Sequence, residues 1–108
     1  MPASSPSARL ADLGITLPSV AQPVAAYVPA VRSGSLVFTS GQLPMVDGTI
    51  AARGKVGGEI SAEQAHGYAR ICALNALAAI DALVGLDSVV RVVKVVGFVA
   101  AAPGFTAR

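Results

Sequence analysis

The strongest constraint on the fold is a helix signal that begins at Ser61 and ends at Gly85. Ser61-Ala-Glu-Gln64 matches a capping box, in which the Ser61 hydroxyl and the Gln64 side chain each satisfy a backbone N–H of the first turn. Apolar residues then recur at helical spacing on one broad face, and many of them are alanines that allow close approach to a sheet. These residues are Ala65, Tyr68, Ala69, Cys72, Ala76, Ala79, Ile80 and Leu83.

A valine-rich segment follows the helix, over residues 88–100. Both of its faces are mainly apolar, so it predicts a strand that is buried on both sides. One face can meet the helix, and a neighbouring subunit is the simplest cover for the other. Arg91 and Lys94 lie on opposite faces of this strand, either as a strand end with an interface ion pair or as a charged lining at a subunit junction.

Two shorter strands are predicted before the helix, at about residues 25–31 and 36–40, with Ser33-Gly34 in the turn between them. Asp47-Gly48 signals a second turn. Near the N-terminus, residues 9–13 predict one or two helical turns that Gly14 closes. We expect residues 1–22 to form a tail with this short helix and residues 23–108 to form one α+β domain.

Composition bears on assembly. Hydrophobic residues make up 54% of the 108 residues and charged residues only 13%, so a large part of the surface must be apolar or shared with a partner chain. Apolar exposure of this kind on a small domain usually marks an interface. We therefore expect an oligomer.

Charge and cysteine content exclude several classes of protein. The net charge is only +2 and the basic residues are scattered, which argues against nucleic-acid binding. Cys72 is the single cysteine, so no intrachain disulfide can form and a reducing compartment fits.

The N-terminus lacks the apolar core of a signal peptide, and we expect a cytoplasmic protein that does not bind membranes. His66 has no partner at metal-ligand spacing, and we expect neither a metal nor a cofactor.

The motif with the most chemical content is Thr39-Ser40-Gly41-Gln42-Leu43-Pro44, with Tyr27 upstream. Gly41 allows close backbone approach or a positive φ, and Pro44 stops ladder pairing. The loop could present backbone N–H groups to a small anion, or it could be a turn that only ends a strand. Tyr27 could orient a substrate through its hydroxyl, or it could be a tyrosine at the edge of the core.

This segment resembles the Rid family, the YjgF-type reactive-intermediate (enamine/imine) deaminases. The resemblance runs from about Pro23 to Phe105 and includes the helix with Arg70-Ile-Cys-Ala-Leu-Asn75. It implies a chorismate-mutase-like layout of a sheet packed on helices. It also implies a homotrimer with sites at the subunit junctions and hydrolysis of 2-imino or enamine acids to 2-oxo acids and ammonia, without a cofactor.

Site residues follow from the resemblance only where the motif matches. Tyr27 would orient the substrate, and the Gly41 N–H would hold it, with Ser40 and Gln42 shaping the loop. Phe98 could wall the substrate pocket, although core packing is the simpler role. Asn75 favours a helix packing or hydrogen-bonding role.

The family's carboxylate-binding Arg and its water-placing Glu lie beyond a second long helix, and Arg108 does not match that Arg by motif. We therefore expect the family's C-terminal helix and strand to be missing from this chain. This chain would then be either part of a longer Rid protein, with the deaminase activity impaired in the part given, or a genuine short variant that has lost the deaminase Arg. The alternative function is a non-catalytic trimer that binds a small metabolite or a partner protein.

Overall fold

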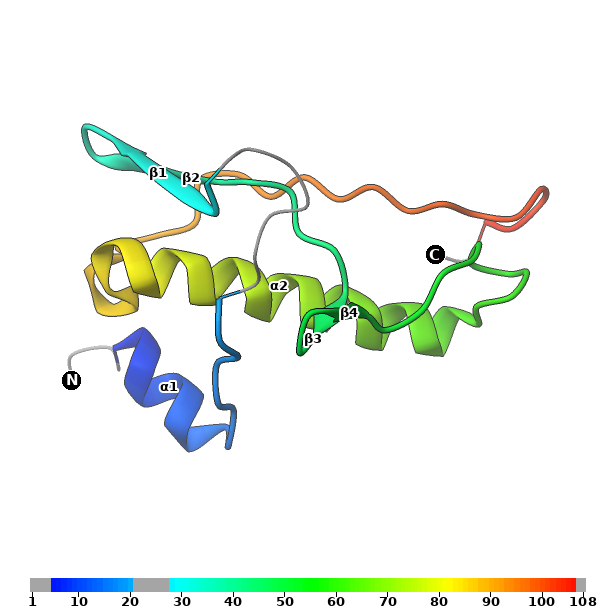
Figure 1. Cartoon of the computed structure of the whole chain (residues 1–108), viewed down its shortest axis with the longest axis horizontal. Coiled ribbons are helices and arrows are strands. Elements are labelled where there is room, and N and C mark those ends of the chain that lie inside the picture. The colour runs from blue at the N-terminus through cyan, green and yellow to red at the C-terminus, as the bar shows by residue number, and fades with distance from the viewer. Residues whose placement is uncertain (1–4, 21–27, 107–108) are drawn as a thin grey trace.

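One long helix organises the chain in the computed structural model, which describes residues 5–20 and 28–106 (Figure 1). Helix α2 spans Ala62–Val84, and its capping box is formed as predicted. The Ser61 hydroxyl accepts a hydrogen bond from the Gln64 N–H at 3.0 Å, and Gln64 Oε1 accepts from the Ser61 N–H at 2.9 Å. Gly85 ends the helix with a φ of +80°. The helix prediction is confirmed at both ends.

Two small antiparallel hairpins precede the helix. Strands β1 (Ala30–Ser33) and β2 (Leu36–Thr39) pair through a two-residue turn in which Gly34 has a φ of +59°, as a type II′ turn requires. Strands β3 (Met45–Val46) and β4 (Thr49–Ile50) pair around Asp47 and Gly48, which both have positive φ. The two predicted turns are confirmed, and the first half of the predicted 25–31 strand lies outside the described residues.

The β1–β2 hairpin and β3 pack against α2, so the arrangement is a sheet on a helix. Directly paired residues of a hairpin share a face. Arg32 and Val37 form one such pair, and Val37 is half-buried. Because the hairpin packs against α2, we assign the face with Val37 to the helix side. The opposite face carries Val31, Phe38 and Leu36, each about half exposed. The expected α+β class is therefore confirmed, and this hairpin has an uncovered apolar face.

The buried core is small within residues 5–20 and 28–106. Its apolar members there are Val56, Ile60, Ala78, Ala79 and Leu86. On α2 the buried positions are Asn75, Ala78 and Ala79, while Ala69 and Leu83 of the predicted apolar face are exposed, because only one side of the helix meets the hairpins. The Cα radius of gyration is 15.3 Å, against about 13 Å for a compact chain of this length.

A short N-terminal helix is hydrogen-bonded to the turn at the C-terminal end of α2. Helix α1 spans Pro6–Asp12, so it begins three residues before the predicted range 9–13; Gly14 closes it with a φ of +69°, as predicted. The Ser7 N–H donates to Asp87 Oδ1 at 2.7 Å, and the Ser7 hydroxyl donates to Asp87 Oδ2 at 2.5 Å. Asp87 belongs to the 3₁₀ turn η1 (Leu86–Ser88), so these bonds join the start of the chain to the end of α2.

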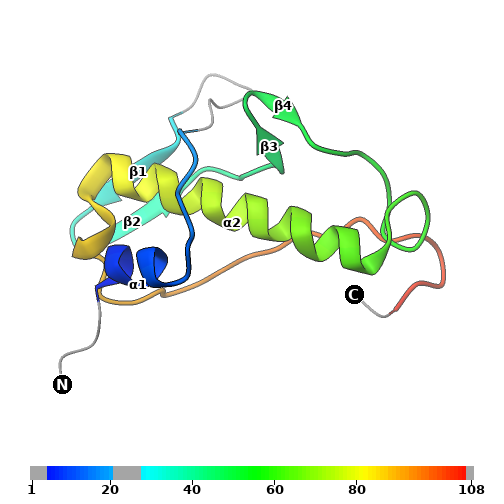
Figure 2. The ribbon, with the colours of Figure 1, turned by 90° about the horizontal axis from the view of Figure 1, so that it is seen from below.

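The valine-rich segment 89–100 runs back along α2 in both ribbon views (Figures 1 and 2) but pairs with no strand among the described residues. Val90 is 96% exposed and Val95 is 82% exposed. Backbone hydrogen bonds hold its two ends: the Val89 N–H donates to the Leu86 carbonyl at 3.1 Å, the Val56 N–H donates to the Ala100 carbonyl at 2.9 Å, and the Ala102 N–H donates to the Val56 carbonyl at 2.9 Å. The prediction of a strand buried on both faces is wrong for this structure, because the described chain offers this segment no ladder partner.

Candidate functional site

The candidate site is the loop that joins the two hairpins, residues 40–44. On its N-terminal side the loop is anchored to Pro29, just beyond the last pair of the β1–β2 ladder. The Ser40 N–H donates to the Pro29 carbonyl at 2.8 Å, and the Ser40 hydroxyl donates to the same oxygen at 3.2 Å. Ser40 is half-buried, and both of its donors are used to fix the loop's entry.

On its C-terminal side the loop is anchored to α2. The Leu43 carbonyl accepts from the Met45 N–H at 2.7 Å, which closes a three-residue turn around Pro44. Asn75 Nδ2 donates to the same Leu43 oxygen at 3.2 Å and to the Met45 carbonyl at 3.1 Å. Asn75 is only 2% exposed, so a buried side chain of the helix holds the loop's exit. Its expected hydrogen-bonding role is confirmed.

Between the two anchors lie Gly41 and Gln42, whose main-chain N–H groups make no hydrogen bond within the described part of the chain. The Gln42 side chain turns back instead, with Nε2 3.3 Å from the Ser40 carbonyl and 3.5 Å from its hydroxyl. The expectation that Gly41 serves a positive φ is wrong, because its φ lies outside that region. A Cβ at Gly41 would meet nothing within 4 Å in this chain, so any close approach that needs this glycine comes from outside the described residues.

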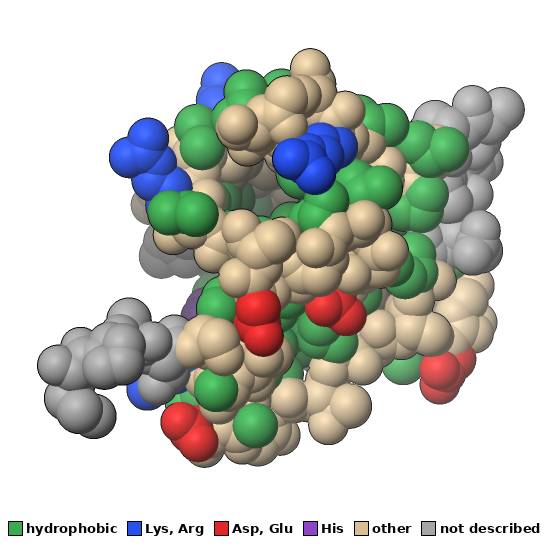
Figure 3. Space-filling view, turned by 90° about the vertical axis from the view of Figure 1, so that its left-hand side faces the viewer, with side chains coloured by type: hydrophobic (Ala, Val, Ile, Leu, Met, Phe, Trp, Pro, Cys, Tyr) green, Lys and Arg blue, Asp and Glu red, His purple; other side chains and the backbone are tan. Residues whose placement is uncertain are grey.

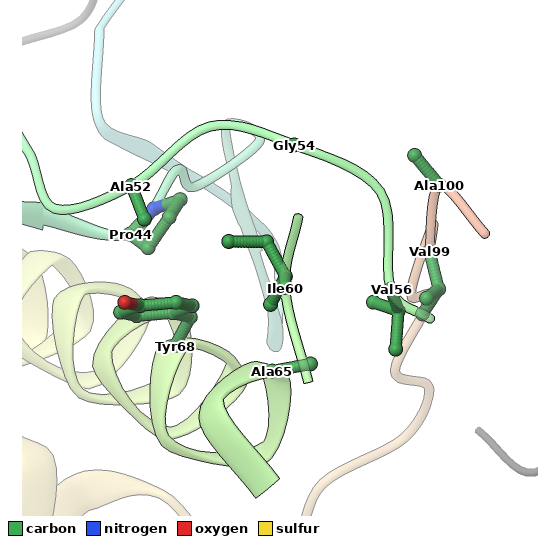
Figure 4. A pocket seen from close by; sticks show the side chains of 9 residues that line it. All are labelled: Pro44, Ala52, Gly54, Val56, Ile60, Ala65, Tyr68, Val99 and Ala100. Carbon is green, nitrogen blue, oxygen red and sulfur yellow. The ribbon is translucent and has the colours of Figure 1, made fainter. Parts of the chain in front are cut away.

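Two hollows flank the loop. The first, about 330 Å³, lies along the hairpin and ends at Thr39 and Ser40; its other lining residues are Val28, Ala30, Val31 and Phe38. The second, about 170 Å³, lies on the other side, where the side chains of Pro44, Ile60 and Tyr68 face one another (Figure 4). Neither hollow is lined by a charged residue. An anion at this loop would therefore depend on backbone N–H groups or on a residue from elsewhere.

The predicted site residues are only partly brought together. Ser40, Gly41 and Gln42 share the anchored loop. Phe98 is 94% exposed and lines neither hollow, and Tyr27 lies outside the described residues. The anchors Pro29 and Asn75 were not predicted as parts of the site. A contact between residues 43 and 75, which are 32 positions apart, leaves no periodic signal in one sequence.

Titratable groups near α2 offer little chemistry. Partial burial raises the pKa of the Cys72 thiol, which disfavours the thiolate that a nucleophile needs. The described residues contain no group of three or more His, Cys, Asp or Glu that could hold a metal ion.

By length and a mean hydropathy of 1.4, α2 could cross a membrane. One such helix is weak evidence for a membrane span; one side of α2, with the buried Asn75, packs against β1, β2 and β3, and 17% of the candidate span is buried.

Three comparisons with known proteins extend this description. A family model described as "YjgF/chorismate mutase-like, putative endoribonuclease" matches residues 7–102. The protein TCP17 of Trypanosoma cruzi is 41% identical over 101 residues, which are 93% of this chain and 63% of that protein.

Two solved structures are also similar. Atu1372 of Agrobacterium tumefaciens, of unknown function, superimposes with a TM-score of 0.78 at 44% identity, over 92% of this chain and 61% of its own. A protein of Shewanella oneidensis MR-1, described as a "putative endoribonuclease", gives a TM-score of 0.72 at 32% identity, over 79% of this chain and 56% of its own. The chain thus spans less than two thirds of the length of each of these relatives.

Proposed function

Because the chain belongs to the YjgF/chorismate mutase-like family, we propose that it hydrolyses reactive 2-imino or enamine acids to 2-oxo acids and ammonia. The observation that carries this proposal is the pair of unbonded N–H groups at Gly41 and Gln42, held between two anchored ends. Fixed N–H groups that have no partner within the chain are a common way to bind a carboxylate or to stabilise developing negative charge.

The proposed reaction needs only water. The substrate carboxylate binds at the Gly41 and Gln42 amides, with Ser40 shaping the loop. Water adds to the C=N carbon, the C=N electron pair moves to nitrogen, and the nitrogen takes up a proton. The resulting carbinolamine then loses ammonia as its hydroxyl becomes the carbonyl of the 2-oxo acid. Tyr27 orients the substrate in this proposal, and no cofactor takes part. Phe98 lines neither hollow of the single chain, so in this proposal it walls the pocket at a junction between subunits.

We also propose that the protein acts as a cytoplasmic homotrimer. Two apolar surfaces support this: the outward face of the β1–β2 hairpin and the exposed valines of residues 89–100. Apolar area of this kind is costly in water and is normally covered by a subunit. A junction between subunits would also supply the charged partner that neither hollow contains.

The alternative is a non-catalytic binder of small carboxylated metabolites. Ser40 and Gln42 are neither acids nor bases near neutral pH, which favours binding at this loop without chemistry. An endoribonuclease activity, which the family description carries, has less support. On the face seen in Figure 3, Lys and Arg side chains stand apart rather than forming a stripe, and the net charge is only +2.

Imine hydrolysis tests the proposal directly. An amino-acid dehydratase would generate the 2-imino acid, and release of 2-oxo acid would be followed with and without the protein. In Gly41→Val the added Cβ meets nothing within 4 Å of this chain, and the isopropyl group blocks approach to the loop amides; circular dichroism checks that the variant is folded. We expect the native protein to accelerate hydrolysis and Gly41→Val to lose most of that acceleration.

The matched control is Gly67→Ala, a glycine of α2 whose added Cβ also meets nothing within 4 Å. It should hydrolyse the imine like the native protein. If the native protein gives no acceleration over buffer but still binds a 2-oxo acid at this loop, the binder is the correct function. If it neither accelerates nor binds, both proposals are wrong.

A further inference from the structure

Asn75 is the one buried polar residue of α2 among the described residues, and its amide group points at the candidate loop. We infer that Asn75 is a positioning residue, which holds the Gly41 and Gln42 N–H groups in the geometry that receives the ligand's carboxylate. The inference rests on the proposed function for the identity of the ligand. The positioning itself rests on the hydrogen bonds of this chain.

The donor count of Asn75 matches the loop. A primary amide has two N–H donors on one nitrogen, and Asn75 uses that nitrogen for two carbonyls of one short segment, Leu43 and Met45. Serine could donate only one hydrogen bond, and leucine none. Lysine or arginine would bring a charge into a site that is only 2% exposed, where an unpaired charge is disfavoured.

The position of these bonds matters as much as their number. Only Gly41 and Gln42 separate the Ser40 anchor from the Leu43 anchor, so the two ends determine the path between them. Glycine is the residue with the widest choice of backbone conformation. Without the Asn75 bonds, the exit would keep only the 2.8 Å bond from the Ala51 N–H to the Pro44 carbonyl and the turn bond within residues 43–45. Gly41 would then let the loop move more widely, and a ligand would have to order it again on binding. Such ordering weakens affinity.

The test uses the nitrogen-15-labelled 108-residue chain and three variants. Asn75→Leu removes both donors at similar volume, and Asn75→Ser leaves one. Ala78→Gly is the matched control, because it lowers the stability of the same helix at a buried position that makes no side-chain hydrogen bond to the loop. Amide relaxation at Gly41 and Gln42 reports the loop's mobility, and titration with 2-oxobutanoate gives the dissociation constant.

We expect the Gly41 and Gln42 amides to gain fast motion in the order native, Asn75→Ser, Asn75→Leu, with Ala78→Gly like the native protein. The dissociation constant should rise by roughly tenfold in Asn75→Leu, which is about the factor that ordering one backbone residue is worth. It should change less than twofold in Ala78→Gly. A merely structural role of Asn75 would affect both helix variants alike.

The inference and the proposed function fail in different ways. If 2-oxobutanoate does not bind the native chain, the ligand assignment is wrong and the relaxation data alone judge the positioning. If the loop amides of Asn75→Leu are as rigid as those of the native protein, Asn75 does not position them. If Asn75→Leu binds 2-oxobutanoate as tightly as the native protein does, Asn75 likewise does not position the amides for binding. If Asn75→Leu does not fold, the comparison of Asn75→Ser with Ala78→Gly decides.

Discussion

Two extended segments on opposite sides of α2 in the sequence have opposite environments. Residues 40–46 have a mixed composition, yet hydrogen bonds to Pro29, Asn75 and Ala51 hold them. Residues 89–100 are mostly valine, the residue type most often found in strands, yet several of their side chains are more than two thirds exposed. Hydrogen-bond partners, and not side-chain preference, separate the two segments.

The physical reason is that strand preference is a property of surroundings. A β-branched side chain restricts the backbone to extended conformations but supplies no partner for its N–H and C=O groups. Residues 89–100 are hydrogen-bonded only at their two ends among the described residues, where the Val89 N–H donates to the Leu86 carbonyl and Val56 bonds to Ala100 and Ala102. An unpaired apolar edge of this kind invites pairing with another chain. The candidate site has the opposite design, with fixed ends and two open amides.

The largest effect should come from breaking the anchored segment. Asn75→Leu leaves the Met45 carbonyl without its Asn75 donor beneath the hairpin. We expect the free energy of unfolding to fall by about 2 kcal/mol, the typical cost of a buried polar group left unsatisfied. Urea denaturation followed by circular dichroism measures this. An unchanged midpoint would show that the loop is not held by α2.

The next effect should come from weakening the hydrogen bonds that join the end of residues 89–100 to Val56. Gly57 has a φ of +89°, and a Cβ there would lie 2.4 Å from the Phe105 ring. Gly57→Ala should therefore cost roughly 1–2 kcal/mol through strain at the neighbour of Val56. Gly58→Ala is the matched control, because its added Cβ meets neighbours only at 3.4 Å or more. Equal losses in the two variants would refute the explanation.

A smaller effect should appear just before residues 89–100, where Asp87 of η1 accepts the hydrogen bonds that hold α1. The hydrogen bonds from the Ser7 side chain and backbone lower the pKa of Asp87 below its ordinary value of 3.8. A lowered folded pKa stabilises the fold above pH 3.8, and this stability is lost as the pH falls through the folded pKa.

The pKa of Glu59 is lowered in the same way by the Lys55 N–H. The Asp87 contribution is therefore the difference between the native protein and Asp87→Asn. We expect the native protein to lose more stability than Asp87→Asn between pH 5 and pH 3, a window set by the ordinary value of 3.8 and its lowering. Thermal unfolding at each pH measures this. Parallel curves would mean that Asp87 does not hold α1 in solution.

The sequence predicted the local elements well and the long-range ones poorly. The capping box at Ser61, the turns at Gly34 and Asp47-Gly48, and the helix end at Gly14 are encoded by neighbouring residues, and all were confirmed. The loop at Ser40 was found from its motif. The Asn75 anchor was not found as part of the site, because its partners lie 30 and 32 positions away. The state of residues 89–100 was missed because a run of valines does not reveal whether a ladder partner exists, and the described residues offer one only at Val56.

The smallest effect is expected within the free segment itself, and it tests the comparison most sharply. Val95 is 82% exposed, so Val95→Lys should change the free energy of unfolding of the dilute chain by no more than about 0.5 kcal/mol. Val56→Lys is the contrast, because Val56 is only 6% exposed and a buried lysine there would be strongly destabilising.

Concentration then separates the folded monomer from the proposed trimer. If residues 89–100 are covered by a neighbouring subunit, Val95→Lys should leave the dilute chain unaffected but weaken association, which analytical ultracentrifugation over a concentration series would detect. A loss of stability well above 0.5 kcal/mol in the dilute chain would mean that Val95 is packed within one chain. The contrast between an anchored loop and a free strand would then be wrong, because both segments would be held by the same subunit.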